Sequence, residues 1–238
     1  MLGWQLYCTP TNIDSEAAIC HANDPMGGRL SEHGLFFREF LRNFHTTGAV
    51  LPSGRFLAAA LARFVDQPSS QPRRILEVGP GTGAVTRRII AGMSPRDRLD
   101  LVELNETFVR QLEQRFQSDP PFQAVADRAR VLHCPVEDLP AGESYDLIVS
   151  GLPLNNFSVA VVENILTTLT RLLAKGGTLS FFEYIAVRRA RAIVSGKAER
   201  QRLRGIGQAM RAVLDGQEIR RDAVLLNVLP AWVHHVRT

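Results

Sequence analysis

Apolar runs alternate with amphipathic stretches along most of the chain beyond residue 66. Five of the runs predict buried strands, over Arg74 to Val78, Leu99 to Glu103, Ala129 to His133, Tyr145 to Ser150 and Gly177 to Tyr184. Helical spacing predicts helices between them, over Thr82 to Met93, Asn105 to Phe116 and Ser158 to Leu173. This alternation is typical of a parallel sheet with helices on both faces.

The end of the chain breaks the alternation. After a long basic helical region come two strand-like pieces, Ala223 to Val228 and Trp232 to Arg237, joined through the short segment 229–231. A tight connection requires an antiparallel pair, because parallel strands need a long crossover. The sequence therefore predicts an α/β protein with a Rossmann-like seven-stranded sheet, mostly parallel with an antiparallel C-terminal strand pair.

The part before residue 66 has a different character. Residues 1–34 mix Pro, Gly, Asn and Ser with few apolar repeats, which predicts a loosely ordered extension. Leu35 to Phe44 has aromatic and leucine side chains at helical spacing, and Arg55 to Val65 predicts a second helix. We interpret residues 35–65 as an N-terminal helical lid and residues 66–238 as the main domain.

Length and composition favour one folded domain, since the chain has 238 residues of which 45% are hydrophobic and 22% charged. The formal charge of +4 is compatible with an anionic partner such as nucleic acid or an acidic membrane surface, and equally with a mildly basic cytoplasmic enzyme. The three cysteines lack the paired spacing of a zinc site, so we predict no metal. The first residues lack the pattern of a signal peptide and no stretch has the apolar length of a spanning helix, so we expect a cytoplasmic protein.

The segment LEVGPGTGAVTRRI places Gly79, Gly81 and Gly83 between the first strand and its helix. Glycines there allow a tight turn and let a ligand approach the backbone at the positive end of a helix. With Ala84 and Glu103 the loop also satisfies the dinucleotide fingerprint, so a nicotinamide enzyme is a competitor. Three features favour another cofactor: an acid before the first glycine, the G-x-G-x-G spacing and the antiparallel end of the sheet.

These residues resemble the class I S-adenosylmethionine-dependent methyltransferases. The resemblance implies that Glu77 and the three glycines bind the methionine portion of S-adenosylmethionine and that Glu103 accepts both ribose hydroxyls. The alternative for Glu103 is a solvated acid that caps the helix after Asn105. Further cofactor contacts are expected from residues beside the strand ends, namely Leu104, Val136, Glu137 and Ser150. The adenine contact stays open among Val136, Glu137 and Asp138, each of which could be an ordinary turn residue.

A narrower resemblance covers about residues 35–238. The segments FFREFLRNFHTTGAVLPSGRFLAAAL, LEVGPGTGAVT, VELNETF, SGLPLNNF and LPAWVHHVR together are similar to the bacterial phospholipid N-methyltransferases, including those that methylate phosphatidylethanolamine or ornithine lipids. In the related rRNA adenine dimethylases the fourth loop reads N-L-P-Y or N-I-P-Y, whereas Leu154 stands here after the proline. That departure disfavours a base-methylating role. The alternatives are an rRNA adenine or small-molecule amine methyltransferase, or a non-catalytic cofactor-binding interaction protein.

The loop after the fourth strand carries the candidate catalytic groups, Leu152, Pro153, Asn155 and Asn156. Methyl transfer to an amine mainly needs alignment of the reactants, and carbonyl oxygens or aromatic faces favour the developing positive charge. Phe157 could supply such a face. The alternative is that the two asparagines only cap the helix that begins near Ser158.

A lipid substrate also requires access to a membrane. Leu35 to Phe44 has the composition of an interfacial helix, and the stretch Arg188 to Arg204 is rich in arginine, which anionic headgroups attract. Core packing, RNA binding and a solvated helix face are the alternatives for these segments. We expect peripheral association with the inner face of the membrane and no obligate protein partner.

Overall fold

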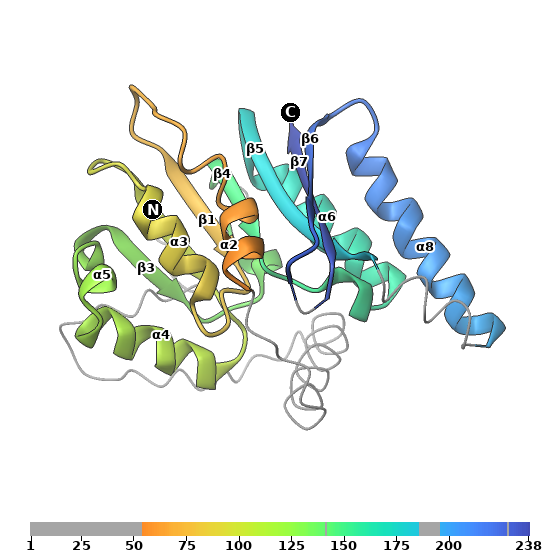
Figure 1. Cartoon of the computed structure of the whole chain (residues 1–238), viewed down its shortest axis with the longest axis horizontal. Helices are drawn as coiled ribbons and strands as arrows, with labels where there is room; N and C mark the ends of the chain where they lie inside the picture. The colour runs from red at the N-terminus through yellow and green to blue at the C-terminus, as the bar shows by residue number, and fades with distance from the viewer. Residues whose placement is uncertain (1–53, 141, 186–195, 228) are drawn as a thin grey trace, which may run out of the picture.

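The computed structural model describes residues 54–140, 142–185, 196–227 and 229–238. Its centre is a seven-stranded sheet in the order β3-β2-β1-β4-β5-β7-β6 (Figure 1). The strands are β1 (Arg74–Val78), β2 (Arg98–Val102), β3 (Ala129–Leu132), β4 (Tyr145–Ser150), β5 (Leu173–Tyr184), β6 (Glu218–Val224) and β7 (Ala231–Arg237). The first five are parallel, and β7 pairs antiparallel with both β5 and β6. The predicted fold class is confirmed.

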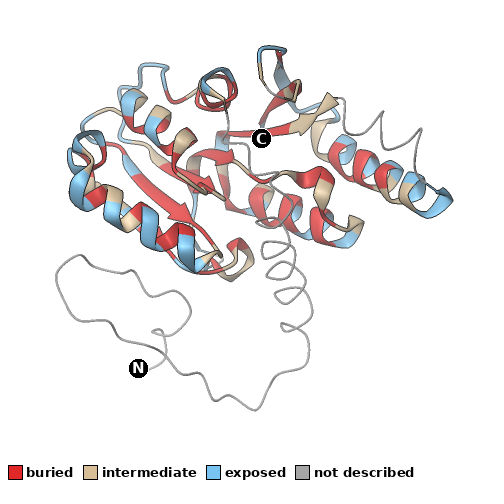
Figure 2. Ribbon diagram, turned by 60° about the horizontal axis from the view of Figure 1, so that its bottom comes forward, coloured by how far each residue is buried: buried red, intermediate tan, exposed pale blue. Residues whose placement is uncertain are grey.

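Helices cover both faces of the sheet. They are α2 (Arg55–Leu61), α3 (Ala84–Gly92), α4 (Glu106–Ser118), α5 (Pro120–Gln123), α6 (Val159–Leu172) and α8 (Lys197–Leu214), with short 3-10 turns η1 (Ala126–Arg128), η2 (Val136–Asp138) and η3 (Leu154–Asn156). Successive strand residues face opposite sides: Ile75 packs with the layer of α2 to α5, and Leu76 with the layer of α6 and α8. The central strands are accordingly buried between helices whose outer faces are exposed (Figure 2).

The prediction for the sixth strand is wrong. The strand spans Glu218–Val224 instead of Ala223 to Val228, and residues 225–230 connect it to β7. Leu225 and Leu226 gave the apolar signal, but they are 66% and 76% exposed in this connection. The true strand lies at the edge of the sheet and most of its residues are exposed, so its charged side chains hide the strand pattern.

The first two predicted segments of the chain, residues 1–34 and Leu35 to Phe44, lie outside the described residues. The described part of the predicted lid is α2, which packs on the sheet with Leu57 and Leu61 fully buried. Regular helix ends at Leu61, and turns continue it to residue 66. Within the described residues, no helix combines the length and apolar character needed to cross a membrane.

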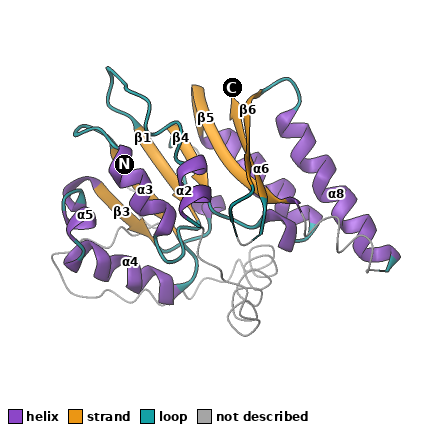
Figure 3. Cartoon of the chain, viewed as in Figure 1, coloured by secondary structure: helices purple, strands orange, loops and turns teal. Residues whose placement is uncertain are grey.

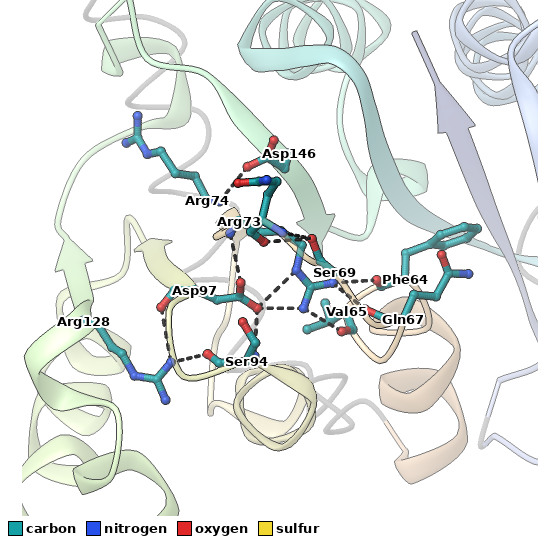
Figure 4. A network of polar contacts seen from close by, with 11 residues as sticks. Phe64, Val65, Gln67, Ser69, Arg73, Arg74, Ser94, Asp97, Arg128 and Asp146 are labelled. Carbon is teal, nitrogen blue, oxygen red and sulfur yellow. Dashed lines mark hydrogen bonds and ion pairs between the residues drawn. The ribbon is translucent and has the colours of Figure 1, made fainter.

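A polar network closes the edge of the sheet where β1 and β2 begin (Figure 4). Arg73 Nη2 donates to Asp97 Oδ2 at 2.7 Å and to the Val65 carbonyl at 3.0 Å, and the Ser94 amide donates to the same carboxylate at 2.9 Å. Burial disfavours a charge on Asp97, which is 0% exposed, but these donors outweigh it and lower the pKa of the carboxyl group. The network ties the segment after α2 to the sheet.

Candidate functional site

The parallel strands end level with one another at the opposite edge. Val78, the last residue of β1, is in register with Val102 of β2 and Ser150 of β4. Backbone hydrogen bonds continue past the strands, from the Gly79 amide to the Val102 carbonyl at 2.9 Å and from the Gly151 amide to the Val78 carbonyl at 2.8 Å. The loops that follow these strands therefore form one continuous surface, at the lower edge of the sheet in Figure 3.

The glycine loop needs its glycines for conformation. Gly79, Gly81 and Gly83 have φ values of +70°, +55° and +79°, in the left-handed region that other residues rarely adopt. A Cβ added at Gly81 would meet nothing within 4 Å, so this face of the loop is open to a ligand. Gly83 is the N-cap of α3, which places the loop at the positive end of that helix.

Glu103 follows β2 and is only 5% exposed. Its Oε2 accepts from the Gly81 amide at 3.0 Å, and its Oε1 accepts from the amides of Leu104 at 2.9 Å and Asn105 at 2.8 Å. Burial raises the pKa of Glu103 against these three hydrogen bonds. The cap of α4 is Asn105, whose side chain accepts from the Thr107 amide at 2.9 Å. Glu103 is thus not a solvated capping acid but a buried acceptor that bridges the first two loops.

Glu77 lies beneath the glycine loop with 0% exposure. Neither of its carboxylate oxygens has a hydrogen-bond partner among the described residues, and the Thr86 hydroxyl beside it has none either. Burial raises the pKa of Glu77 to about 8; the nearby hydroxyl and amide of Thr86 oppose this, and the charge of Glu103 adds to it. A buried acid without donors is costly to the protein alone, and it is a group that a bound cation or donor would satisfy.

The remaining predicted cofactor contacts lie at the same edge, but their side chains or carbonyl groups are buried or already hydrogen-bonded to other residues. The Val136 side chain is 4% exposed and belongs to the core, and Glu137 Oε1 accepts from Asn164 Nδ2 of α6 at 3.2 Å. The Leu104 carbonyl lies 3.1 Å from His133 Nε2. Ser150 is fully buried, and its hydroxyl oxygen accepts from an amide of its own loop at 3.4 Å.

In the loop after β4, the structure separates candidates that the sequence grouped together. Leu152 is 8% exposed, and a Cβ added at Gly79 would lie 2.5 Å from its Cδ2, so its side chain packs against the glycine loop. The prediction that the Phe157 ring faces a ligand is wrong, because that ring is 2% exposed and lies in the core beneath α6. Ser158 caps α6, with its hydroxyl accepting from the Val161 amide at 3.4 Å, so neither asparagine is the cap. Pro153 and Asn156 are half-buried in the η3 turn.

Asn155 has the most specific environment of this loop. It is 2% exposed, and its Nδ2 lies 3.5 Å from the Tyr184 carbonyl at the end of β5. Its Oδ1 is buried and has no hydrogen-bond partner among the described residues. A buried amide oxygen without a partner is costly to the protein alone, and a hydrogen-bond donor from a ligand would satisfy it.

Arg202 of α8 holds this turn from the other side, and sequence reasoning missed this role. Its guanidinium donates to the Asn155 carbonyl at 3.2 Å and also to the Phe157 carbonyl. Glu199, one turn earlier on the helix, orients it through Nε–Oε2 and Nη2–Oε1 contacts of 2.8 and 2.6 Å. Arg202 stands in a run of arginines, so no signal in the sequence distinguishes it from exposed neighbours such as Arg204.

The sequence of this region is similar to that of known proteins. The family model described as "Methyltransferase domain" matches residues 75–177, which include β1 to β4 and all four loops of the site. Residues 75–177 are thus a methyltransferase domain. The O-methyltransferase TomG from Streptomyces achromogenes, solved with S-adenosylmethionine, has a similar fold, with a TM-score of 0.56 and 15% identity over 90% of this chain and 92% of that one.

A second solved methyltransferase agrees. The O-methyltransferase from Bacillus cereus, solved with S-adenosylhomocysteine, has a TM-score of 0.55 and 16% identity over 84% of this chain and 90% of that one. These likenesses define the fold of the methyltransferase domain, and S-adenosylmethionine is its cofactor.

Curated relatives point to more than one substrate. The chain is 27% identical over 151 residues to the ornithine lipid N-methyltransferase of Singulisphaera acidiphila, a match that spans 63% of this chain and 77% of that protein. It is 38% identical over 96 residues to ribosomal RNA small subunit methyltransferase A of Parasynechococcus marenigrum. The second match spans 40% of this chain and only 30% of that protein.

Proposed function

We propose that this methyltransferase acts on the amine of a membrane lipid headgroup, such as phosphatidylethanolamine or an amino lipid of the ornithine lipid kind. The observation that carries the proposal is the buried, unpartnered Oδ1 of Asn155 in the loop after β4, which leaves the same edge of the sheet as the glycine loop. The similarity to an ornithine lipid N-methyltransferase supports the same substrate class.

The residues fit S-adenosylmethionine. The open face of the loop at Gly81 would admit the methionine portion, and the unpartnered Glu77 carboxylate lies beneath it, suited to a cationic ammonium group. Glu103 accepts three hydrogen bonds, and two carboxylate oxygens offer about four acceptor positions, so a ribose hydroxyl would complete the set or displace an amide donor. When bound, the cofactor supplies a methyl group on a sulfonium sulfur.

The substrate amine would be held by the loop after β4. Asn155 Oδ1 accepts an N–H of the neutral amine and so directs the nitrogen lone pair toward the methyl carbon. With the cofactor bound, its methyl group would pass from sulfur to this nitrogen and leave a neutral thioether, and the nitrogen would become positive and then release a proton to water. The same amide oxygen favours that positive charge, so the contact strengthens in the transition state.

This chemistry favours nitrogen over oxygen as the acceptor. A hydroxyl group must lose its proton as it attacks, which calls for a general base within hydrogen-bond reach. Asn155 is an amide and cannot take that proton. An alkyl amine is mostly protonated near pH 7 and must release that proton to water before it attacks, but it needs no base during the transfer itself, so alignment by Asn155 suffices for that step.

The rRNA enzymes are the second candidate class because of their higher local identity. Leu154, the residue after the proline, is fully buried in the core in this structure. A flipped adenine is held by side chains that stack on its faces, and Leu154, being fully buried, offers no exposed face for such a contact. We therefore rank lipid amines ahead of RNA.

Expression of the chain in a bacterial host lacking methylated amino lipids tests the proposal. We expect mass spectrometry of lipid extracts to show mono-, di- or trimethylated amino lipids with the wild-type protein and none with Glu103→Ala, which should lose the cofactor. Methylated adenine in ribosomal RNA with unchanged lipids would support the second class. Cofactor binding with neither product would indicate a non-catalytic binding protein.

A further inference from the structure

The exposed apolar side chains of the described residues are not scattered. The large ones are Phe56, Ile219, Leu225 and Leu226, and all four line one open groove of about 1130 Å³ between α2 and β6. Three of them gather at one end, where the connection after β6 meets the start of α2. The Asn227 side chain accepts from the Gly54 amide at 3.1 Å and so fixes the two segments side by side. We call Phe56, Leu225 and Leu226 the apolar rim.

The apolar rim lies at the edge of the sheet that carries the candidate site. The Ile185 amide donates to the Pro230 carbonyl at 2.9 Å, which joins the rim's loop to the end of β5. The carbonyl oxygen of the preceding residue, Tyr184, lies 3.5 Å from Asn155 Nδ2. A surface that holds the apolar rim would therefore present its nearest headgroups to Asn155.

Arg55 places a cation beside the apolar rim, and the groove that runs from the rim toward the start of β6 is net positive. The guanidinium of Arg55 lies 4.8 Å above the Phe56 ring, which pairs a cation with an aromatic side chain as at membrane interfaces. The groove is lined by four arginines, Arg63, Arg88, Arg220 and Arg237, and two acids, Asp66 and Asp222. Four positive and two negative charges leave a net charge of +2.

From these observations we propose that the apolar rim inserts into the interfacial region of an anionic lipid bilayer and orients the active site toward it. The proposal rests on the lipid amine as substrate. Two leucines at 66% and 76% exposure on a loop tip can enter the headgroup boundary, while Arg55 beside Phe56 stays at the charged surface. A second copy fits less well, since antiparallel pairing of two edge strands centred on Arg220 and Arg221 would bring arginines of the two copies against each other.

The test uses full-length protein and vesicles of phosphatidylglycerol and phosphatidylcholine, which contain no amine substrate. We expect Leu225→Ser/Leu226→Ser to weaken sedimentation with these vesicles by at least about fivefold, because apolar area no longer enters the interface. Ile219→Ser is the matched control, because it removes an exposed aliphatic side chain at the far end of β6, away from the apolar rim. Its vesicle binding should stay within about twofold of wild type. Melting temperatures should not change, because all three side chains are exposed.

Three outcomes would overturn the proposal. They are vesicle binding that the double variant leaves unchanged, equal loss in the Ile219→Ser control, and a fall from dimer to monomer by light scattering in the double variant. Turnover of an amino lipid in detergent micelles separates this proposal from the proposed function. The double variant should keep wild-type turnover in micelles. Absent turnover in the wild type would reject the lipid amine as substrate, and the vesicle measurement would then test membrane binding alone.

Discussion

The two neighbouring asparagines of η3 differ at the scale of single side chains. Asn155 is 2% exposed with an unpartnered Oδ1, while Asn156 is half-buried. We expect Asn155→Ala to lower kcat by about tenfold or more with nearly unchanged affinity for S-adenosylmethionine, because the lost hydrogen bond strengthens in the transition state. Asn156→Ala should have a smaller effect.

Methyl-transfer assays on lipid vesicles measure kcat, calorimetry measures the affinity for the cofactor, and thermal melts measure stability. Because Ser158 caps α6, neither substitution should cost the stability of a lost cap. Equal turnover in both variants and the wild type would mean that the substrate amine is held elsewhere.

The burial of Glu77 should make the stability of the protein depend on pH. Its pKa is raised by burial to about 8, so between about pH 4.5 and 8 the folded protein binds a proton that the unfolded chain has lost. Stability of the ligand-free protein should therefore fall as pH rises through this range. Glu77→Gln cannot ionise, so in urea titrations it should exceed the wild type by several kcal/mol at pH 8.5 and match it near pH 4. Parallel stability curves for the two proteins would show that Glu77 finds a partner.

At the scale of elements, much of the fold was predictable from local signals. Strands β1 to β4 are buried on both faces and read as apolar runs, and their level ends place Glu77, Glu103 and Asn155 at one edge without knowledge of any contact. The edge strand β6 escaped because its side chains face water. The burial of Phe157 and the pairing of Arg202 with loop carbonyls depend on tertiary packing, which no local pattern encodes.

Helix α8 is coupled to the substrate loop through Arg202. We expect Arg202→Gln to lower kcat about tenfold, because the turn that carries Asn155 loses its charge-assisted hydrogen bonds. Arg202→Lys should recover part of the activity, and Arg204→Gln, an exposed arginine on the same helix, should behave as wild type. Steady-state kinetics with a separate measurement of cofactor affinity would show whether the loss is confined to turnover; equal losses in the Arg202 and Arg204 variants would point to surface charge instead.

At the scale of the whole molecule, the two edges of the sheet have different roles. One carries the candidate site, and the other carries a polar network that stabilises the fold. Asp97 and Arg73 form a buried ion pair at the edge away from the site, with the carboxylate side chain 0% exposed. We expect Asp97→Asn to lower the free energy of unfolding by about 3 kcal/mol at pH 7 and to leave cofactor affinity unchanged in the folded protein. Because the pKa of Asp97 is lowered, its contribution is present above the unfolded pKa and is lost as pH falls through the folded one. Urea unfolding at pH 7 and in acid would show the difference shrinking; a constant difference would contradict the assignment.

The contact between Gly151 and Gly79 limits how this enzyme can evolve. A Cβ at Gly151 would lie 2.6 Å from the Gly79 carbonyl oxygen, a backbone atom that no change of side chain can remove. At Gly79 the nearest obstacle is a leucine side chain, but its positive φ still restricts the position to glycine. One position is thus constrained by space and the other by conformation. A substitution at either position would displace the end of a strand, so we expect relatives with other substrates to keep both glycines and to differ at residues outside this contact.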